Sequence, residues 1–165
     1  MKKIILLGSL LILLISCKSC KITYSMVDGS IDASTFSVDI FKELAPKAPA
    51  GYGANFSNFL KDYVISRTKL NLTASAPDIE ISGKIMMYDT APLSVQSNEE
   101  AALNRLTVGI LVSVINNKDE AQSFEMNFSQ FSDYSASQDL ADVETALIED
   151  INNKLSQDII NKLTS

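Results

Sequence analysis

Residues 79–87 alternate between apolar and polar side chains more regularly than any other segment of this chain. Glu80, Ser82 and Lys84 lie on one side of this segment, and Ile79, Ile81, Gly83, Ile85 and Met87 lie on the other. A period of two predicts a half-buried β-strand, which here continues toward Pro92. Gly83 indicates either a bulge or a close backbone approach. The fold is therefore expected to contain a sheet with one face against a core.

Three other segments are also predicted as strands. Residues 35–41 alternate, with Phe36, Val38 and Ile40 on the side expected to face the core. Another alternating segment begins at Phe124. Residues 106–115 are instead nearly all apolar, as expected of a strand covered on both faces. The polar run at residues 116–120 predicts a hairpin loop between these last two strands.

Two segments have the apolar spacing of helices. The first is expected to start at Asn55, which can cap it, and to end within residues 67–70, whereas residues 51–53 before it read as a turn. Its apolar stripe comprises Phe56, Phe59, Leu60, Tyr63 and Val64. The second helix is expected to follow a capping-box pattern of Ser135 and Gln138, and its apolar stripe continues to residue 163.

The predicted elements follow one another in the order β-α-β-β-β-α. A strand, a helix and a second strand favour one parallel pairing with a right-handed crossover. We therefore predict an α/β (α+β) fold, with a four-stranded mixed sheet and two helices packed on one face. The usual size of domains favours a single domain, which we assign to residues 34–165.

The N-terminal segment reads as an export signal. Lys2 and Lys3 precede an apolar run at residues 4–15, which is too short to cross a bilayer core that needs roughly 20 residues. A charged start, a short apolar run and a small-residue exit make a secretory signal. The ending Leu14-Ile15-Ser16-Cys17 resembles the bacterial lipoprotein signal box. That resemblance implies cleavage before Cys17 and acylation of this cysteine.

Residues 1–16 are thus predicted as a lipoprotein signal peptide and residues 17–33 as a lipidated tether. The alternative is a plain signal peptide or a buried N-terminal helix. In bacterial lipoproteins an aspartate after the acylated cysteine favours the inner membrane, so Lys18 favours anchorage in the outer membrane, facing the periplasm. Cys20 is then either an unpaired thiol in the tether or a site of intermolecular pairing.

Charge and composition argue against several classes of function. Removing residues 1–16 takes away two lysines and no acids, which changes the net charge from −6 to −8, so no nucleic-acid partner is expected. The chain has no histidine, the usual general base and the commonest metal ligand, and we expect no catalytic residue, metal site or cofactor. The alternative is an enzyme that uses only carboxylates, with Asp133 and Glu144 as the first pair to consider.

Two blocks of the sequence resemble a known family. The first block, residues 98–117, reads Asn-Glu-Glu-Ala-Ala-Leu-Asn-Arg-Leu-Thr before the apolar strand. The second block, residues 129–163, contains Ser-Gln-Phe-Ser-Asp-Tyr, Val-Glu-Thr-Ala-Leu-Ile-Glu-Asp-Ile and Asp-Ile-Ile-Asn-Lys-Leu. Behind a lipoprotein signal, these blocks look like the LptE family of lipopolysaccharide-assembly lipoproteins of the outer membrane. The resemblance spans nearly the whole chain after the signal. The family fold, two helices on a four-stranded mixed sheet, agrees with the predicted element order.

The resemblance implies a non-enzymatic protein inside the lumen of an LptD-type outer-membrane β-barrel. There it would plug the barrel, help to assemble it, and contact lipopolysaccharide on its way to the cell surface. Lipopolysaccharide binding is expected to use basic residues against phosphates. Here such residues are scattered, so no lipopolysaccharide-contacting residue is assigned. The alternative function is a free-standing periplasmic lipid- or ligand-binding lipoprotein, which would contain an apolar cavity.

Asn98, Glu99, Asn104 and Arg105 form the candidate partner-binding site. They belong to a polar, charged connection at one end of the predicted sheet, where a plug would meet the barrel wall. The alternative is that Arg105 only pairs with Glu99 or Glu100 on the surface.

One short motif is not explained by the family resemblance or by the partner-binding site. Asp89-Thr90-Ala91 matches an acceptor pattern for O-glycosylation in some Gram-negative periplasms. Matches of three residues are common by chance, so a coincidence is the alternative.

Overall fold

The computed structural model describes residues 32–93 and 102–165. The predicted lipid anchor Cys17 and the predicted site residues Asn98 and Glu99 lie outside these ranges. The elements in chain order are β1 (Thr35–Val38), β2 (Lys42–Glu43), α2 (Tyr52–Arg67), β3 (Asn71–Leu72), β4 (Ile79–Leu93), β5 (Leu103–Asn116), η1 (Glu120–Gln122), β6 (Phe124–Ser135) and α3 (Leu140–Leu163).

The strands form one six-stranded sheet in the order β3-β1-β4-β5-β6, with β2 paired to β4 beside this path. β1 is parallel to β3 and β4, and β2 is parallel to β4. The pairs β4–β5 and β5–β6 are antiparallel. The mixed sheet and the parallel pairing across a helix are therefore confirmed, but the predicted count of four strands is wrong. β2 and β3 have two residues each, too few to show a period in the sequence.

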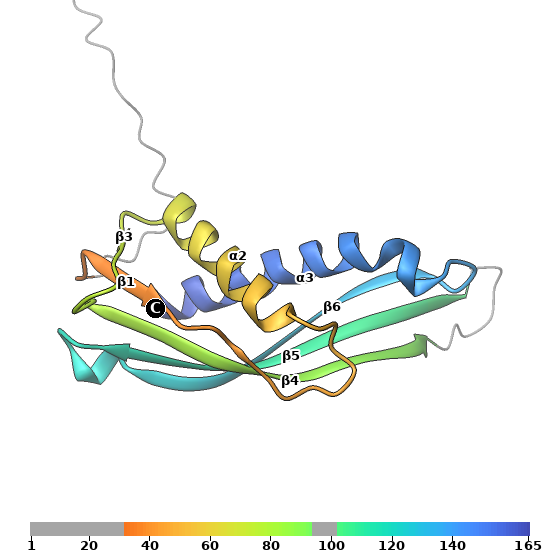
Figure 1. Cartoon of the computed structure of the whole chain (residues 1–165), viewed down its shortest axis with the longest axis horizontal. Coiled ribbons are helices and arrows are strands. Elements are labelled where there is room, and N and C mark those ends of the chain that lie inside the picture. The colour runs from red at the N-terminus through yellow and green to blue at the C-terminus, as the bar shows by residue number, and fades with distance from the viewer. Residues whose placement is uncertain (1–31, 94–101) are drawn as a thin grey trace, which may run out of the picture.

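Both helices pack on the same face of the sheet, as predicted (Figure 1). α3 runs along the long strands, and α2 lies beside it over the end of the sheet that contains β1. The core fills the space between the helices and this face. Phe56 and Leu60 of α2, Ile110 of β5 and Leu155 of α3 are all at most 1% exposed.

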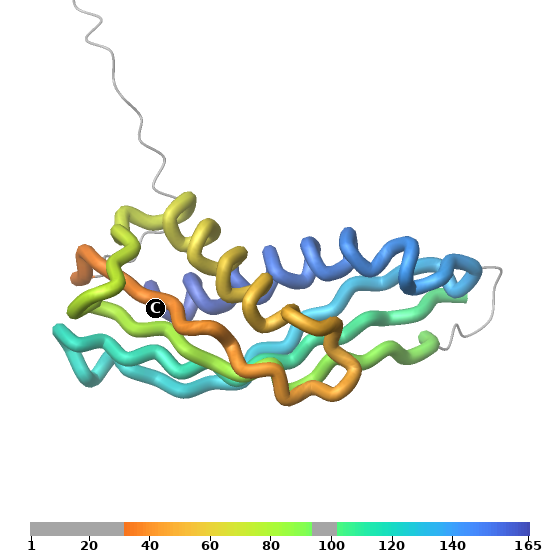
Figure 2. The backbone as a smooth tube through the Cα atoms, in the orientation of Figure 1, coloured from red at the N-terminus to blue at the C-terminus, as the bar shows by residue number. Residues whose placement is uncertain are grey.

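The strand predicted over residues 35–41 breaks after Val38, and its alternation changes phase. The chain continues beside β4 into β2 before it turns back toward α2 (Figure 2). Ile40, which was expected to face the core, is 67% exposed. Phe41 is buried in its place, with 1% exposure.

Two glycines make room for Phe41. A Cβ atom at Gly83 would collide with the Phe41 ring, and one at Gly53 would collide with the Phe41 carbonyl oxygen. The ring packs edge-to-face against Phe56, with centroids 5.0 Å apart. The close backbone approach predicted at Gly83 is thus confirmed, whereas the bulge of β4 follows Ile85.

α2 begins earlier than predicted. Its first residue is Tyr52, because Gly51 at the N-cap has a φ of 83°, a left-handed conformation that favours glycine. Asn55 therefore lies inside the helix and does not cap it. Tyr52 is not part of a surface turn: it is 2% exposed, and its hydroxyl donates a hydrogen bond to Asn152 Oδ1 of α3 at 2.7 Å.

α3 begins later than the predicted capping box. Its N-cap is Asp139, whose side chain accepts a hydrogen bond from the Ala141 N–H at 3.1 Å. Ser135 does not cap the helix because it is the last residue of β6, in register with Leu103 of β5.

β5 is covered on one face only, so the prediction that residues 106–115 are covered on both faces is wrong. The buried series is Leu106, Val108, Ile110, Val112 and Val114. The residues between them face away from the helices, and Ile115 among them is 47% exposed. No described element covers this side (Figure 1). We call it the open face and define it by Lys42 of β2 and the outward residues of β4, β5 and β6: Glu80, Ser82, Lys84, Met87, Asp89, Ala91, Arg105, Thr107, Gly109, Leu111, Ser113, Ile115, Glu125, Asn127, Ser129, Phe131 and Asp133.

Candidate functional site

The antiparallel register arranges the open face in rows across β4, β5 and β6. Successive rows are Met87, Gly109 and Ser129; Asp89, Thr107 and Phe131; and Ala91, Arg105 and Asp133. Side chains directly opposite one another on neighbouring strands are close enough to interact. The open face therefore has an apolar centre and a charged end.

The apolar centre contains exposed side chains that a covering layer would bury. Met87 and Phe131 are each 41% exposed, and Leu111 is half-buried. Gly109 leaves space beside Met87, because a Cβ atom at position 109 would be 3.2 Å from the Met87 Cβ. Exposed apolar side chains of this kind favour association when a partner buries them.

At the charged end, Arg105 is held by two strands. Its Nε and Nη2 atoms donate to the Oδ1 and Oδ2 atoms of Asp133 at 2.7 and 2.9 Å. The guanidinium carbon also lies 3.5 Å from the centroid of the Phe131 ring. Hydrogen bonding to Arg105 lowers the pKa of Asp133, and Asp133 in turn raises the pKa of Arg105. The planar guanidinium is thereby fixed on the open face.

The four residues predicted as a partner-binding site do not all appear on one surface. Asn98 and Glu99 lie outside the described residues. Arg105 faces the open side, but Asn104 belongs to the alternate series of β5 and faces the helix side, in register with Tyr134. The acidic partner shown for Arg105 is Asp133 of β6, and Glu100 also lies outside the described ranges.

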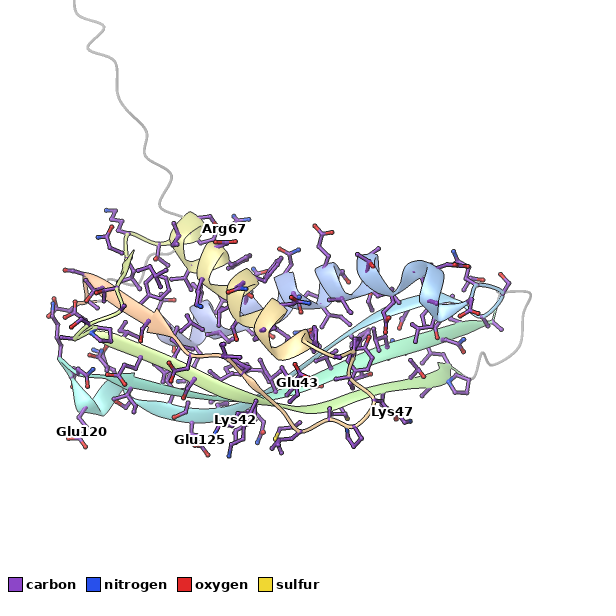
Figure 3. All side chains as sticks on the ribbon, in the orientation of Figure 1. Lys42, Glu43, Lys47, Arg67, Glu120 and Glu125 are labelled. Carbon is purple, nitrogen blue, oxygen red and sulfur yellow. The ribbon has the colours of Figure 1, made fainter. Side chains whose placement is uncertain are left out.

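Two lysines meet on the open face. The parallel register places Lys42 of β2 beside Lys84 of β4. Figure 3 shows Lys42 on the side of the sheet away from the helices, whereas Glu43 accepts a hydrogen bond from the Gly53 N–H of α2. Neither lysine is in an ion pair with another described residue. The sequence alone did not predict this basic pair, because β2 is too short to recognise.

The carboxylates considered for an enzyme do not converge. Asp133 lies on the open face with Arg105. Glu144 belongs to α3 on the other side of the sheet, where it accepts a hydrogen bond from the Tyr88 hydroxyl at 2.6 Å. Burial and this bond raise the pKa of Tyr88. Among residues 32–93 and 102–165, no group of three or more acidic or cysteine side chains could hold a metal ion.

A pocket lies between η1 and the C-terminal end of α3. Polar atoms of Gln122, Ser123 and Lys162 contribute to its lining, which is mainly polar. It does not have the character of the apolar cavity that the free-standing carrier alternative predicts. Within the described ranges, none of the helices has the length and apolar character needed to span a membrane.

A family model, LptE, described as lipopolysaccharide-assembly, matches residues 33–163. The chain belongs to the LptE family. The match runs from the residues before β1 to the last residue of α3, so it includes the whole sheet, both helices and the open face. The family resemblance noted from the two sequence blocks is therefore confirmed. A comparison with curated protein sequences found no match.

Solved structures with the same architecture support the fold of this LptE-family chain. A crystal structure of a protein from Xanthomonas campestris has a TM-score of 0.55 at 12% identity and covers 83% of this chain and 87% of its own. A minor lipoprotein from Acinetobacter baumannii has a TM-score of 0.50 at 12% identity, with coverage of 80% and 93%. An uncharacterized lipoprotein B from Nitrosomonas europaea has a TM-score of 0.50 at 13% identity, with coverage of 81% and 84%.

Proposed function

We propose that this LptE-family chain is a non-enzymatic outer-membrane lipoprotein that plugs an LptD-type β-barrel and helps to assemble it for lipopolysaccharide transport. The observation that carries the proposal is the lipopolysaccharide-assembly family match, which spans residues 33–163. The family partners LptD, and the match includes every element of the fold. The interior of a barrel is largely polar, so a plug needs charged groups on the surface that meets the wall, and Arg105 and Asp133 provide them on the open face.

The open face supports this role because it combines exposed apolar side chains with fixed charges. Met87 and Phe131 would be buried by a barrel wall, and Arg105 beside them is already oriented by Asp133. Interfaces favour this combination of an apolar centre with aromatic and arginine side chains. For lipopolysaccharide itself, Lys42 and Lys84 are the open-face residues best placed to bind a phosphate.

The anchor completes the proposal. Cleavage before Cys17 would leave residues 17–33 as a tether between an acylated cysteine and the folded domain. Each buried methylene of an acyl chain contributes about 0.8 kcal/mol, so two or more chains hold a protein stably in a membrane. The folded domain would then stay at the periplasmic side of the outer membrane.

The proposal is tested by pull-down of the full chain from native membranes in mild detergent, with partners identified by mass spectrometry. A large outer-membrane barrel should co-purify with the wild type, and depletion of the chain should lower the barrel's level. Recovery of the chain with bound lipid and without a barrel would favour the free-standing carrier and contradict the proposal.

Within the same assay, R105E should reduce barrel recovery several-fold, because it reverses the charge at one end of the open face. The swap of R105D with D133R rebuilds an ion pair but moves the positive charge to β6. The swap should therefore stay defective; full recovery would show that Arg105 acts only by supporting the sheet. Lys118 follows the opposite end of β5 and pairs with Asp78, so K118E also reverses an ion-paired charge; as the matched control it should bind as the wild type does.

A further inference from the structure

Asp89-Thr90-Ala91 is the only place in the chain where an aspartate directly precedes a threonine or serine. All three residues are exposed, although they lie within the fifteen-residue strand β4. The motif therefore lies on accessible surface of the folded domain.

Thr90 lies on a part of β4 that has a neighbouring strand on one side only. On its other side β4 pairs with β2 no further than Ile85, whose carbonyl oxygen accepts a hydrogen bond from the Leu44 N–H. Beyond the bulge, β4 continues to pair with β5 through Leu93. No described strand pairs with residues 86–93 on the side away from β5.

The register determines how Thr90 is presented at this edge. Asp89 and Ala91 are in register with Thr107 and Arg105 on the open face, so Thr90 between them belongs to the helix-side series. Hydrogen bonding and ion pairing with Lys47 lower the pKa of the neighbouring Asp89 carboxyl. The hydroxyl of Thr90 makes no hydrogen bond with the described residues.

Asp89 itself is held only loosely. Its Oδ1 atom lies 2.5 Å from the Lys47 Nζ, but the two side chains are 50% and 70% exposed. An ion pair this exposed contributes little and is easily exchanged for another partner. Asp89 and Thr90 project to opposite faces of β4, so an enzyme that reads the Asp-Thr pair would have to approach along the unpaired edge, where both residues are exposed.

We propose that Thr90 carries an O-linked glycan. This inference rests on the proposed export of the chain, because the donor must meet it outside the cytoplasm. The Thr90 oxygen would form a bond to the anomeric carbon of a sugar carried on a lipid diphosphate. The bond from that carbon to the phosphate oxygen breaks, the lipid diphosphate leaves with the electron pair, and a base of the transferase takes the hydroxyl proton.

A glycan at Thr90 would protect the edge without obstructing the proposed interface. Unpaired strand edges are templates for association, and natural proteins cover them or interrupt them. Pro92, two residues further along the same edge, already lacks an N–H. Because Thr90 is in the helix-side series, its glycan would project away from Met87 and Phe131. The edge that carries Thr90 would thus face water while the open face contacts the barrel.

The test is mass spectrometry of the full chain purified from its own cells, as intact protein and as peptides that contain residue 90 or residue 17. The wild type should carry an added saccharide mass on the peptide with Thr90, removable by mild alkali through β-elimination. T90V should lose the added mass completely, and T90S should keep it because the hydroxyl remains.

Three further variants show which neighbouring side chains the modification of Thr90 requires. D89N should lose the added mass because the motif is broken, whereas K47M removes only the ion pair and should keep it. T107V, which alters the threonine in register with Asp89, should also keep it. Urea unfolding of each variant verifies that the domain is folded.

Two patterns would overturn the inference, and they are distinguishable. An unmodified Thr90 in a chain whose Cys17 is acylated would exclude the glycan and leave the proposed location intact. An unmodified Thr90 with an unacylated Cys17 would remove both the glycan and the proposed export. An added mass that persists in T90V would place the modification at another residue.

Discussion

At the scale of single residues, the burial of Phe41 depends on the absence of a side chain at Gly83. A Cβ atom at position 83 would collide with the Phe41 ring and with the Leu111 carbonyl oxygen, which is backbone and cannot rotate away. Overpacking of a tight core typically costs about 1–3 kcal/mol. We therefore expect G83A to lower the urea midpoint of unfolding by a corresponding amount, at an unchanged slope.

G109A is the matched control for this prediction. The same added methyl group on β5 meets the Met87 Cβ at 3.2 Å, on the open face where Met87 is 41% exposed and can move. G109A should therefore shift the midpoint much less than G83A does. Equal midpoint shifts for the two variants would mean that the loss of stability comes from replacing any strand glycine, and not from a collision with Phe41.

At the scale of elements, the sequence predicted the strands and helices in which the apolar pattern extends over many consecutive residues. β4 alternates over many residues and α3 carries an apolar stripe through 24 residues, so both were recognised from their period. The phase change at Phe41 was not predictable, because it depends on Gly83 and Gly53, which meet that ring only in the folded chain.

The same scale explains what the sequence could not reveal about the candidate site. In residues 106–115, Leu111 and Ile115 of the outward series made the segment look apolar throughout, although the described chain covers only one of its faces. Arg105 was expected in a polar connection at one end of the sheet, but it lies within β5, and its bond to Asp133 depends on the β5–β6 register. Lys42 and Lys84 lie side by side only because β2 pairs with β4, and a strand of two residues has no recognisable period in the sequence.

The start of α3 provides a test at the element scale. Asp139 caps the helix in the structure, and removal of such a cap typically costs about 1 kcal/mol. D139A should therefore lower the free energy of unfolding by about that amount. S135A, at the residue that the capping-box pattern favours, should have a smaller effect because Ser135 belongs to β6. A larger loss in S135A than in D139A would contradict the observed helix start.

At the scale of the whole molecule, the two sides of the domain offer a partner different surfaces. On one side the helices bury most of their apolar residues against the sheet and leave Ile65 exposed, whereas on the open face Met87, Ile115 and Phe131 are exposed. Burial of apolar surface favours association by roughly 25 cal/mol per Å², so the open face has more to gain from a partner. We therefore expect the barrel to contact the sheet and not the helices.

A pair of charge variants tests this orientation in the membrane pull-down. M87E places a charge in the apolar centre, where a wall would desolvate it, and should reduce barrel recovery by at least roughly tenfold, the effect of about 1.4 kcal/mol. E149K alters the exposed side of α3 and should bind normally. Because both positions are at the surface, neither variant should shift the urea midpoint of the free domain appreciably. Loss of the barrel with E149K and its retention with M87E would mean that α3 contacts the barrel wall and that the open face does not.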